Sequence, residues 1–285
     1  MSSPKKASTS LPRKDQPVNP NLPGNSDDLS AVKCERLHEN FLSNEFKSLE
    51  APAKLSLYSY TATELAKAAM TCAKLSKNSL SLLQRKALKE HKDNYNKKYK
   101  LDDGVPIKVT IAAYFKLFDD LFFLGSLQVG RRVTIEVDQK KFSETTRKGS
   151  SSEVDGANQW LIEIHKNDKG LCDPVEILQE KLTTLMHEMI HVYLGLFGCR
   201  RCEENWQEQG LSGHGIAFLD TMFTLHKEAP RILEETLGFS SICLEALKEE
   251  IQGGGLKGGI PSLDELARWG LAEKVEELQT FLAET

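Results

Sequence analysis

The sequence predicts an α+β fold in which a short antiparallel sheet packs on helices. Apolar residues recur at helical spacing along several long stretches, whereas residues 133–137 and 160–164 alternate apolar and polar side chains as half-buried strands do. Hydrophobic residues make up 40% of the 285 positions, which is enough for a core and excludes a wholly disordered chain. We therefore expect a small mixed domain with flanking helices.

The N-terminal part of the chain divides into a polar tail and a basic helical region. Residues 1–30 contain five of the ten prolines, and we expect a disordered tail there. Residues 31–104 are expected to form a helical, basic N-terminal extension, because apolar residues recur at helical spacing over 61–100. Between residues 67 and 100, ten lysines and arginines stand against two acidic residues, which predicts a basic helical face.

A helix and the two strands follow this basic region. Apolar residues from Ile107 to Leu124 recur at helical spacing, and Gly125 is expected to end that helix. The polar stretch 148–156 is expected to be a loop or a hairpin tip, and residues 142–146 could form a short further strand. The predicted sheet therefore contains two or three short strands.

The helix with the clearest start signal begins after Asp173. Asp173 is expected to be the N-cap and Pro174 the first helical residue, with Glu176 completing an arrangement like a capping box. The helix should run to about Leu196 and end at Gly198. Its buried face is expected to consist of Leu178, Leu182, Leu185 and Met189.

The C-terminal part is expected to be helical and acidic. A helix is predicted over 213–227, with a buried face made of Phe218, Met222 and Leu225. Residues 231–285 are expected to form an acidic helical C-terminal extension with helices around 231–251 and 262–283. The glycine-rich run 253–259 lies between these two helices and predicts a flexible joint.

His187, Glu188 and His191 form an H-E-x-x-H motif on the helix that starts after Asp173. Two histidines four residues apart project from one face of a helix and can bind a single Zn²⁺. Glu188 follows the first histidine, so its carboxylate can reach a water at the metal without occupying the metal. The alternative is a core helix with two incidental histidines. We prefer the metal site, because these polar side chains on a half-buried helix need partners that a plain core rarely supplies.

The third metal ligand must come from another part of the chain, because a catalytic zinc site takes three protein ligands and keeps one position for water. The best candidate is His214, since the flanking Gly213 and Gly215 let the backbone turn tightly and approach the metal. The competing candidates are Glu203, Glu204, Glu208 and Asp220. The predicted cofactor is therefore Zn²⁺ held by His187, His191 and His214.

Two segments of the chain resemble the SprT-like metallopeptidase domain. Residues 185–193 read LMHEMIHVY, and residues 213–218 read GHGIAF. The family pattern is H-E-M-I/L-H, a variable insert, and then H-G-x-x-F, preceded by a helix and short strands in the same order. The resemblance implies a zincin-like domain over 105–230 in which the H-E-x-x-H helix is central.

The resemblance also implies a function. By this likeness, His187, His191 and His214 would bind zinc, and Glu188 would be the catalytic base of a zinc-dependent protein endopeptidase. Relatives include Spartan-type proteases, which digest proteins crosslinked to DNA, so the substrates would be chromatin or DNA-bound proteins and the role DNA–protein crosslink repair. The C-terminal four-cysteine zinc ribbon of many members is absent here, because Cys243 is the only cysteine beyond residue 202.

Two other functions fit the same motif. A non-catalytic adaptor on nucleic acid or chromatin would keep zinc as a structural site, although it would have no need of Glu188 as a base. A zinc hydrolase could act on a substrate other than protein, because H-E-x-x-H specifies activation of water and not the acyl group. For the peptidase, an extended substrate is expected to pair with an edge strand, for which 160–164 is the candidate. Tyr193, Arg200 and Arg201 are candidates for stabilising the oxyanion.

The cysteines and the absence of apolar runs bear on the cellular compartment. Six cysteines in 285 residues do not indicate a disulfide framework, which favours a reducing compartment. Cys199 and Cys202 form a C-x-x-C pair that could be half of a metal site together with Cys172, a redox pair or, as we expect, two ordinary loop thiols. No apolar run approaches the ~20 residues of a membrane span, so we expect an intracellular protein, nuclear or cytoplasmic, without membrane association.

The basic stretch 67–100 is the candidate surface for DNA. The net charge of −4 does not drive the whole chain onto nucleic acid, but a basic helical face can contact phosphates. The competing interpretation is a solvated helix face, which is favoured because base-reading residues and interleaved aromatic residues are missing. Binding there would be independent of DNA sequence and sensitive to salt. The sequence gives no indication of the oligomeric state.

Overall fold

The structure is a computed structural model of the chain, and it describes residues 34, 35, 37, 48–100, 105–138, 148–154, 158–165, 173–234, 242–256 and 261–284. The predicted tail 1–30 and the strand considered at 142–146 lie outside these described residues. The contacts divide the chain into two units, and all elements below belong to the unit Lys33–Thr285. The boundaries predicted at 104 and 230 fall inside this unit.

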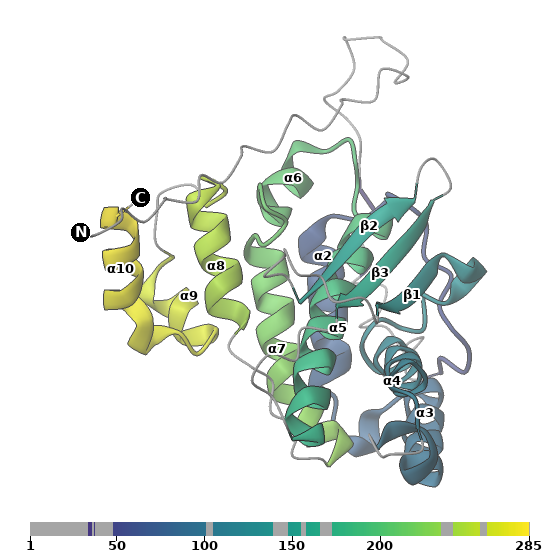
Figure 1. Cartoon of the computed structure of the whole chain (residues 1–285). Helices are drawn as coiled ribbons and strands as arrows, with labels where there is room; N and C mark the ends of the chain where they lie inside the picture. Colours follow the sequence, from purple (N-terminus) through teal and green to yellow (C-terminus); the bar gives the residue numbers. More distant parts are fainter. Residues whose placement is uncertain are drawn as a thin grey trace. The chain divides into compact units, whose positions relative to one another are not determined.

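A three-stranded sheet of order β1-β3-β2 is formed by β1 (Val133–Asp138), β2 (Gly149–Val154) and β3 (Gln159–His165) (Figure 1). β3 pairs with β1 in parallel and with β2 antiparallel. The α+β class is confirmed, but the sheet is mixed and not antiparallel as predicted. The reason is that β2 pairs antiparallel with β3, whereas β1 lies on the other side of β3 and runs parallel to it. The strands predicted at 133–137 and 160–164 are confirmed.

The stretch 148–156, predicted as a loop or hairpin tip, contains β2. Two of its serines pair with apolar residues of β3, because Ser151 stands opposite Ile162 and Ser152 stands opposite Leu161. Backbone pairing with β3, and not the intrinsic preference of serine, makes this segment a strand. Because β3 is paired on both sides, the prediction that 160–164 is an edge strand was wrong. Among the described residues, the edges of the sheet are β1 and β2.

The stretch 61–100 is helical as predicted, but it is interrupted. It consists of α2 (Ala62–Lys74), the 3₁₀ turn η2 (Lys77–Ser79), α3 (Leu82–Asn94) and the π turn η3 (Tyr95–Tyr99). The backbone is extended at Leu75 and Leu80, on either side of η2. Helix α3 starts with a capping box, in which the Ser81 hydroxyl accepts from the Gln84 N–H and the Gln84 side chain accepts from the Ser81 N–H. Sequence analysis missed this start signal.

The helix predicted from residue 107 is α4 (Ile107–Phe122). The chain leaves it through Gly125, whose φ of 69° is the left-handed conformation that glycine favours at helix ends. The buried carboxylate of Asp119 accepts a hydrogen bond from the Gln128 backbone N–H at 3.0 Å and fixes the path of this turn. The 3₁₀ turn η4 (Val129–Arg131) then leads into β1.

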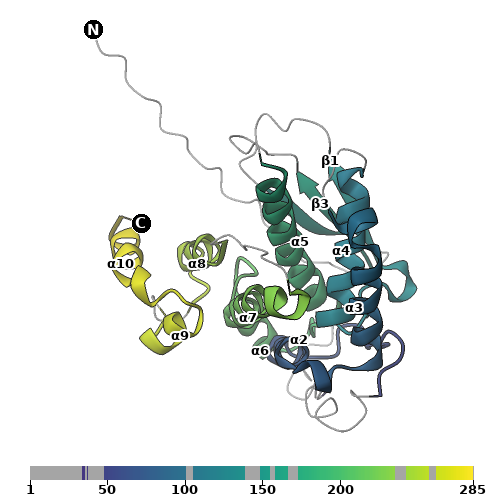
Figure 2. The same ribbon diagram turned by 90° about the horizontal axis from the view of Figure 1, so that it is seen from below.

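Helix α5 (Pro174–Phe197) lies at the centre of the fold. Asp173 caps its first turn and Gly198 is its C-cap, as predicted. α5 contacts α4 and α7 as well as β2 and β3 (Figure 2). Trp160 of β3 lies directly on Gly195, where an added Cβ would come within 2.5 Å of the indole ring. The predicted buried face is confirmed for Leu178, Leu182, Leu185 and Met189.

The C-terminal half contains α6 (Glu203–Gln209), α7 (Ile216–Leu233), α8 (Ile242–Gln252), α9 (Leu263–Arg268), η5 (Ala272–Lys274) and α10 (Val275–Glu284). The predicted buried residues Phe218, Met222 and Leu225 are buried in α7. The helix predicted over 231–251 is divided between the end of α7 and α8, and the helix over 262–283 is broken near Gly270, whose φ is 68°. Helix α7 contacts both α2 and α8.

The length and apolarity of these helices bear on membrane crossing. Across the part of the chain that the structure describes, none of them is both long enough and apolar enough to span a bilayer. The longest of them, α5, also carries the charged and polar residues of the H-E-x-x-H motif near its middle.

Candidate metal centre

Three imidazole rings meet beside α5. His187 and His191 project from the same face of this helix, and their Nε2 atoms lie 3.1 Å apart. His214 precedes α7, and its Nε2 lies 3.1 Å from that of His191 and 3.2 Å from that of His187. The structure thus brings the three predicted ligands together in a group that could hold a metal ion.

Phe218, in the first turn of α7, is the surface on which the three rings rest. Its ring centroid lies 4.9 Å from His187, 4.4 Å from His191 and 4.9 Å from His214. The rings of Phe218 and His191 are stacked, with an angle of 26° between their planes. One apolar side chain therefore contacts all three imidazoles and restricts their orientation.

The three nitrogens fit a metal ion. Tetrahedral Zn²⁺ with bonds of about 2.0–2.1 Å spaces its ligand nitrogens about 3.3 Å apart, close to the observed 3.1–3.2 Å. Burial lowers the pKa of His187 to about 3 and that of His214 to about 4, and it lowers the pKa of His191 well below its ordinary value. The rings are therefore neutral near pH 7, which is the form that binds metals.

Glu188 is buried next to the first histidine, with only 6% of its surface exposed. Gly149, the first residue of β2, lies beside it. A Cβ on Gly149 would be 3.4 Å from the Glu188 Oε1 atom and 2.5 Å from the Thr184 Cγ2 atom. A glycine at this position therefore lets the edge strand approach α5 without colliding with Thr184.

A buried carboxylate from α8 holds the loop that carries His214. Glu250 is fully buried. It accepts hydrogen bonds from the backbone N–H groups of Leu211 at 2.6 Å, Ser212 at 3.0 Å and His214 at 3.2 Å. The Ser212 hydroxyl donates to the same carboxylate, and its Oγ lies 3.0 Å from the Nδ1 atom of His214. The Nδ1–H of His214 can donate to Ser212, an arrangement that fixes the ring of a metal ligand.

Two glycines leave space for the ring of His191 and for the carboxylate of Glu250. Gly213 has a φ of 84°, and a Cβ there would lie 3.3 Å from the ring of His191, so the backbone passes close to the histidine group at this position. A Cβ on Gly255 would collide with the carboxylate of Glu250. Gly255 belongs to the run 253–259 that was predicted as a flexible joint, and in the structure it has this steric role.

The competing ligands make other contacts. The Glu208 carboxylate accepts from the Thr63 backbone N–H at 2.7 Å, at the start of α2. The Asp220 carboxylate accepts from the Trp269 indole N–H at 2.7 Å. The side chains of the other two candidates, Glu203 and Glu204, lie outside the part of the chain that the structure describes. Of the candidates whose side chains the structure describes, His214 alone is placed in the histidine group.

Two of the candidates for stabilising the oxyanion, Tyr193 and Arg200, have structural partners. Tyr193 is buried, and its ring centroid lies 5.1 Å from that of Phe123. Arg200 forms an ion pair of 2.6 Å with Glu153 and lies 3.8 Å from the ring centroid of Tyr58. Their role in catalysis stays a prediction.

Sequence reasoning missed Glu250 and Ser212. Glu250 lies in an acidic helix, where a glutamate normally indicates a solvated face. Its one signal is spacing, because it follows the buried Leu247 by three residues and therefore lies near the buried face of α8. Nothing in the sequence indicates that this face packs on the loop before α7.

The chain was compared with known proteins in three ways. No protein-family model matches it, and neither the curated proteins nor the solved structures yielded a match. The resemblance to the SprT-like domain therefore rests on the H-E-x-x-H and H-G-x-x-F motifs.

Proposed function

We propose that this chain is a zinc-dependent protein endopeptidase of the SprT-like type, with His187, His191 and His214 as zinc ligands and Glu188 as catalytic base. The observation that carries the proposal is the meeting of three imidazole nitrogens at 3.1–3.2 Å next to a buried glutamate. Structural zinc sites take four protein ligands, and catalytic ones take three. The histidine group has three ligands among the described residues and adjoins the buried carboxylate of Glu188, and the two features together favour catalysis over the adaptor alternative.

Zinc is the proposed metal because of the donor set. Imidazole nitrogen suits zinc, copper, iron and nickel, whereas magnesium and calcium prefer oxygen. Three neutral imidazoles in a tetrahedral spacing are the ligands of a known class of catalytic zinc site. Replacing His187 or His191 by alanine should abolish zinc binding at the histidine group, and replacing His214 should weaken it, as measured by metal analysis.

The proposed chemistry places the proton transfers on Glu188. A bound zinc ion would lower the pKa of a water and polarise the scissile carbonyl. Glu188 would accept the proton of the attacking water and deliver it to the leaving amine. Its burial beside β2 keeps this carboxylate away from bulk solvent, and Phe218 and Ser212 keep the imidazoles in place.

The edge strand β2 is the proposed docking strand for the substrate. Its first residue, Gly149, adjoins Glu188, and it is paired on one side with β3. An extended peptide that pairs with the other side of β2 would pass next to the base. The edge strand proposed for the substrate is thus 149–154, in place of 160–164.

Glu188→Gln tests the proposal. This substitution keeps the size of the side chain and removes the base, so hydrolysis of an unfolded protein such as casein should fall by about 10²–10⁴-fold. Zinc content should stay unchanged. The matched control is Glu176→Gln, an exposed glutamate on the first turn of the same helix. Equal hydrolysis by both variants would overturn the proposed mechanism.

Action on DNA-bound proteins in the nucleus is the further part of the proposal, and it would rest on the basic stretch 67–100. Part of that charge is already paired, because Lys77 and Lys92 form ion pairs with Glu234 at the end of α7. Binding to DNA should therefore be weak and salt-dependent. A gel-shift measurement tests it, and retardation should be lost when these four residues are changed to glutamate: Arg85, Lys86, Lys89 and Lys92. No retardation of the unaltered chain at low salt would remove this part of the proposal.

A further inference from the structure

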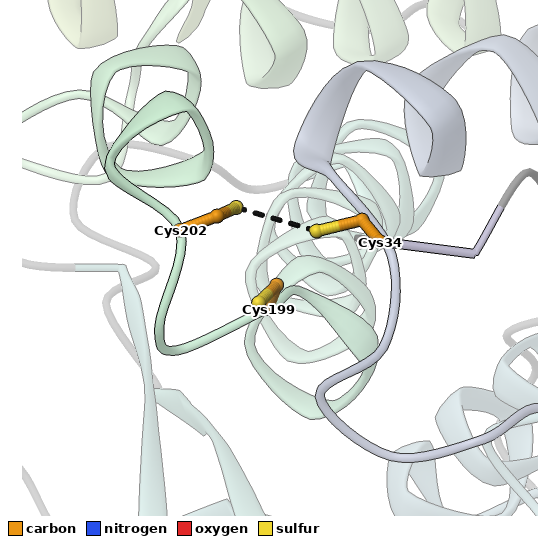
Figure 3. Close-up of side chains that lie close together, drawn as sticks. All are labelled: Cys34, Cys199 and Cys202. Carbon is orange, nitrogen blue, oxygen red and sulfur yellow. Dashed lines mark hydrogen bonds between the residues drawn. The ribbon is translucent and has the colours of Figure 1, made fainter. Parts of the chain in front are cut away.

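Three cysteines from distant parts of the chain lie together near the C-terminal end of α5 (Figure 3). Cys199 comes directly after the C-cap of α5, and Cys202 directly precedes α6. Cys34 joins them from the N-terminal segment, with its Sγ 3.5 Å from the Sγ of Cys202. The three sulfurs all lie within 4.8 Å of one another. This group is separate from the histidine group.

The backbone brings these cysteines together and holds them there. Cys199 donates its N–H to the carbonyl of Tyr60 at 2.7 Å, and Glu35 donates its N–H to the carbonyl of Ser59 at 2.8 Å. Tyr60 forms bridges with both Glu35 and Gly198, so the residues next to Cys34 and Cys199 share one neighbour. The position of the group is therefore set by hydrogen bonds of the main chain, independently of the thiols.

We propose that Cys34, Cys199 and Cys202 form a second zinc site, in which a water or another small ligand takes the fourth position. Zinc–sulfur bonds of about 2.3 Å in a tetrahedral site space the sulfurs about 3.8 Å apart. The 3.5 Å between Cys34 and Cys202 is close to that spacing and far from the ~2.05 Å of a disulfide. Thiolate ligands select zinc over magnesium or calcium. An iron–sulfur cluster would hold its cysteine sulfurs around several iron atoms, farther apart than here.

A cysteine binds a metal as its thiolate, so metal binding at this group releases protons. Zn²⁺ would displace the thiol protons into solvent and compensate the charge that remains. The site would tie the N-terminal segment to the link between α5 and α6, which leads on to His214. Cys199 and Cys202, which were expected to be two ordinary loop thiols, thus supply two of the three cysteine ligands of the proposed site. Cys34 takes the place that was considered for Cys172.

Metal analysis of the full chain tests the second site. The unaltered protein should hold about two zinc ions per chain, Cys34→Ser and Cys202→Ser about one each, and His187→Ala about one. Cys72→Ser is the control, because Cys72 is a buried free cysteine away from the group, and it should keep both ions. Circular dichroism establishes that each variant is folded. If the chain holds one ion that Cys34→Ser loses, the cysteine site stands and the histidine site fails.

Two further measurements bear on the thiols directly. Zinc should protect Cys34, Cys199 and Cys202 from alkylation, as followed by mass spectrometry, and a chelator should expose them. Cobalt in place of zinc should give a thiolate charge-transfer band that Cys34→Ser abolishes and His187→Ala retains. The proposal is overturned if Cys34→Ser keeps the metal content of the unaltered chain, if zinc gives the thiols no protection, or if Cys34 and Cys202 are found in a disulfide in zinc-loaded protein.

Discussion

Replacing Glu250 by glutamine tests whether helix α8 holds the third ligand of the histidine group. One oxygen of Glu250 accepts from the Leu211 N–H, and the other accepts from the N–H groups of Ser212 and His214 and from the Ser212 hydroxyl. Glutamine keeps a single oxygen. In the more favourable orientation of the amide group, the glutamine oxygen keeps the three bonds to Ser212 and His214. The NH₂ group then faces the N–H of Leu211, which loses its acceptor.

The size of the effect follows from the bonds that are lost. A hydrogen bond to a charged group contributes about 1.5–3 kcal/mol, and the three retained bonds weaken when the negative charge is removed. We therefore expect the free energy of unfolding to fall by about 2–4 kcal/mol. The zinc dissociation constant should rise about 10–100-fold, the range observed when an outer partner of a metal-ligating histidine is removed. Glu250→Ala should have a larger effect, because all three N–H groups lose their acceptor.

The assay has two readouts. Competition with a chromophoric chelator gives the zinc affinity, and urea unfolding followed by circular dichroism gives the stability of the zinc-free chain. Glu245→Gln is the matched control, because this glutamate lies on the same helix with its side chain 74% exposed. If Glu250→Gln binds zinc as tightly as Glu245→Gln, the reasoning that links α8 to His214 is refuted.

Two further variants distinguish the contributions of the two side chains that lie next to the Nδ1 atom of His214. The Glu249 carboxylate lies 3.5 Å from the Nδ1 atom of His214, but its side chain is 66% exposed and solvent screens the interaction. The Ser212 oxygen is nearer, at 3.0 Å. Glu249→Gln should therefore change zinc affinity little, and Ser212→Ala should weaken it. The reverse order would make Glu249 the partner that orients the ring.

Three more substitutions have distinct expected results. Phe218→Ala removes the surface under the three imidazoles, so urea unfolding should show a loss of about 3–5 kcal/mol, and chelator competition should show weaker zinc binding. Gly149→Ala would bring a methyl group within 2.5 Å of Thr184 and crowd Glu188, so casein hydrolysis should fall while metal analysis shows unchanged zinc. Ser81→Ala removes the cap of α3 and should cost about 0.5–2 kcal/mol of stability without altering zinc affinity; an altered affinity would show that zinc binding responds to general destabilisation.

The central helix and its motif could be predicted because their signals are local. The start of α5 follows from Asp173 and Pro174, its end follows from Gly198, and the spacing of His187 and His191 determines that they share a face. The approach of His214 could be predicted from its flanking glycines and from the chemical requirement for a third ligand.

The rest could not be predicted because it depends on partners far along the chain. The serines of β2 become a strand only through pairing with β3, and a polar edge strand leaves no apolar alternation to detect. Glu250 looks like a solvated residue until α8 packs beside the loop before α7. Cys34 is separated from Cys202 by 168 positions, and no spacing rule connects them.

The contact between α8 and the His214 loop gives the chain a thermodynamic coupling. If the histidine group binds zinc as proposed, the form in which α8 has left its place should bind zinc more weakly, because the loop loses Glu250 and His214 loses its support. Reciprocity then requires that bound zinc favours the docked α8 by the same factor. A partner that captures α8 in the displaced form would lower zinc occupancy, and removal of zinc would make α8 easier to capture. On the proposed function, zinc binding at the histidine group and docking of α8 are therefore two ends of one equilibrium.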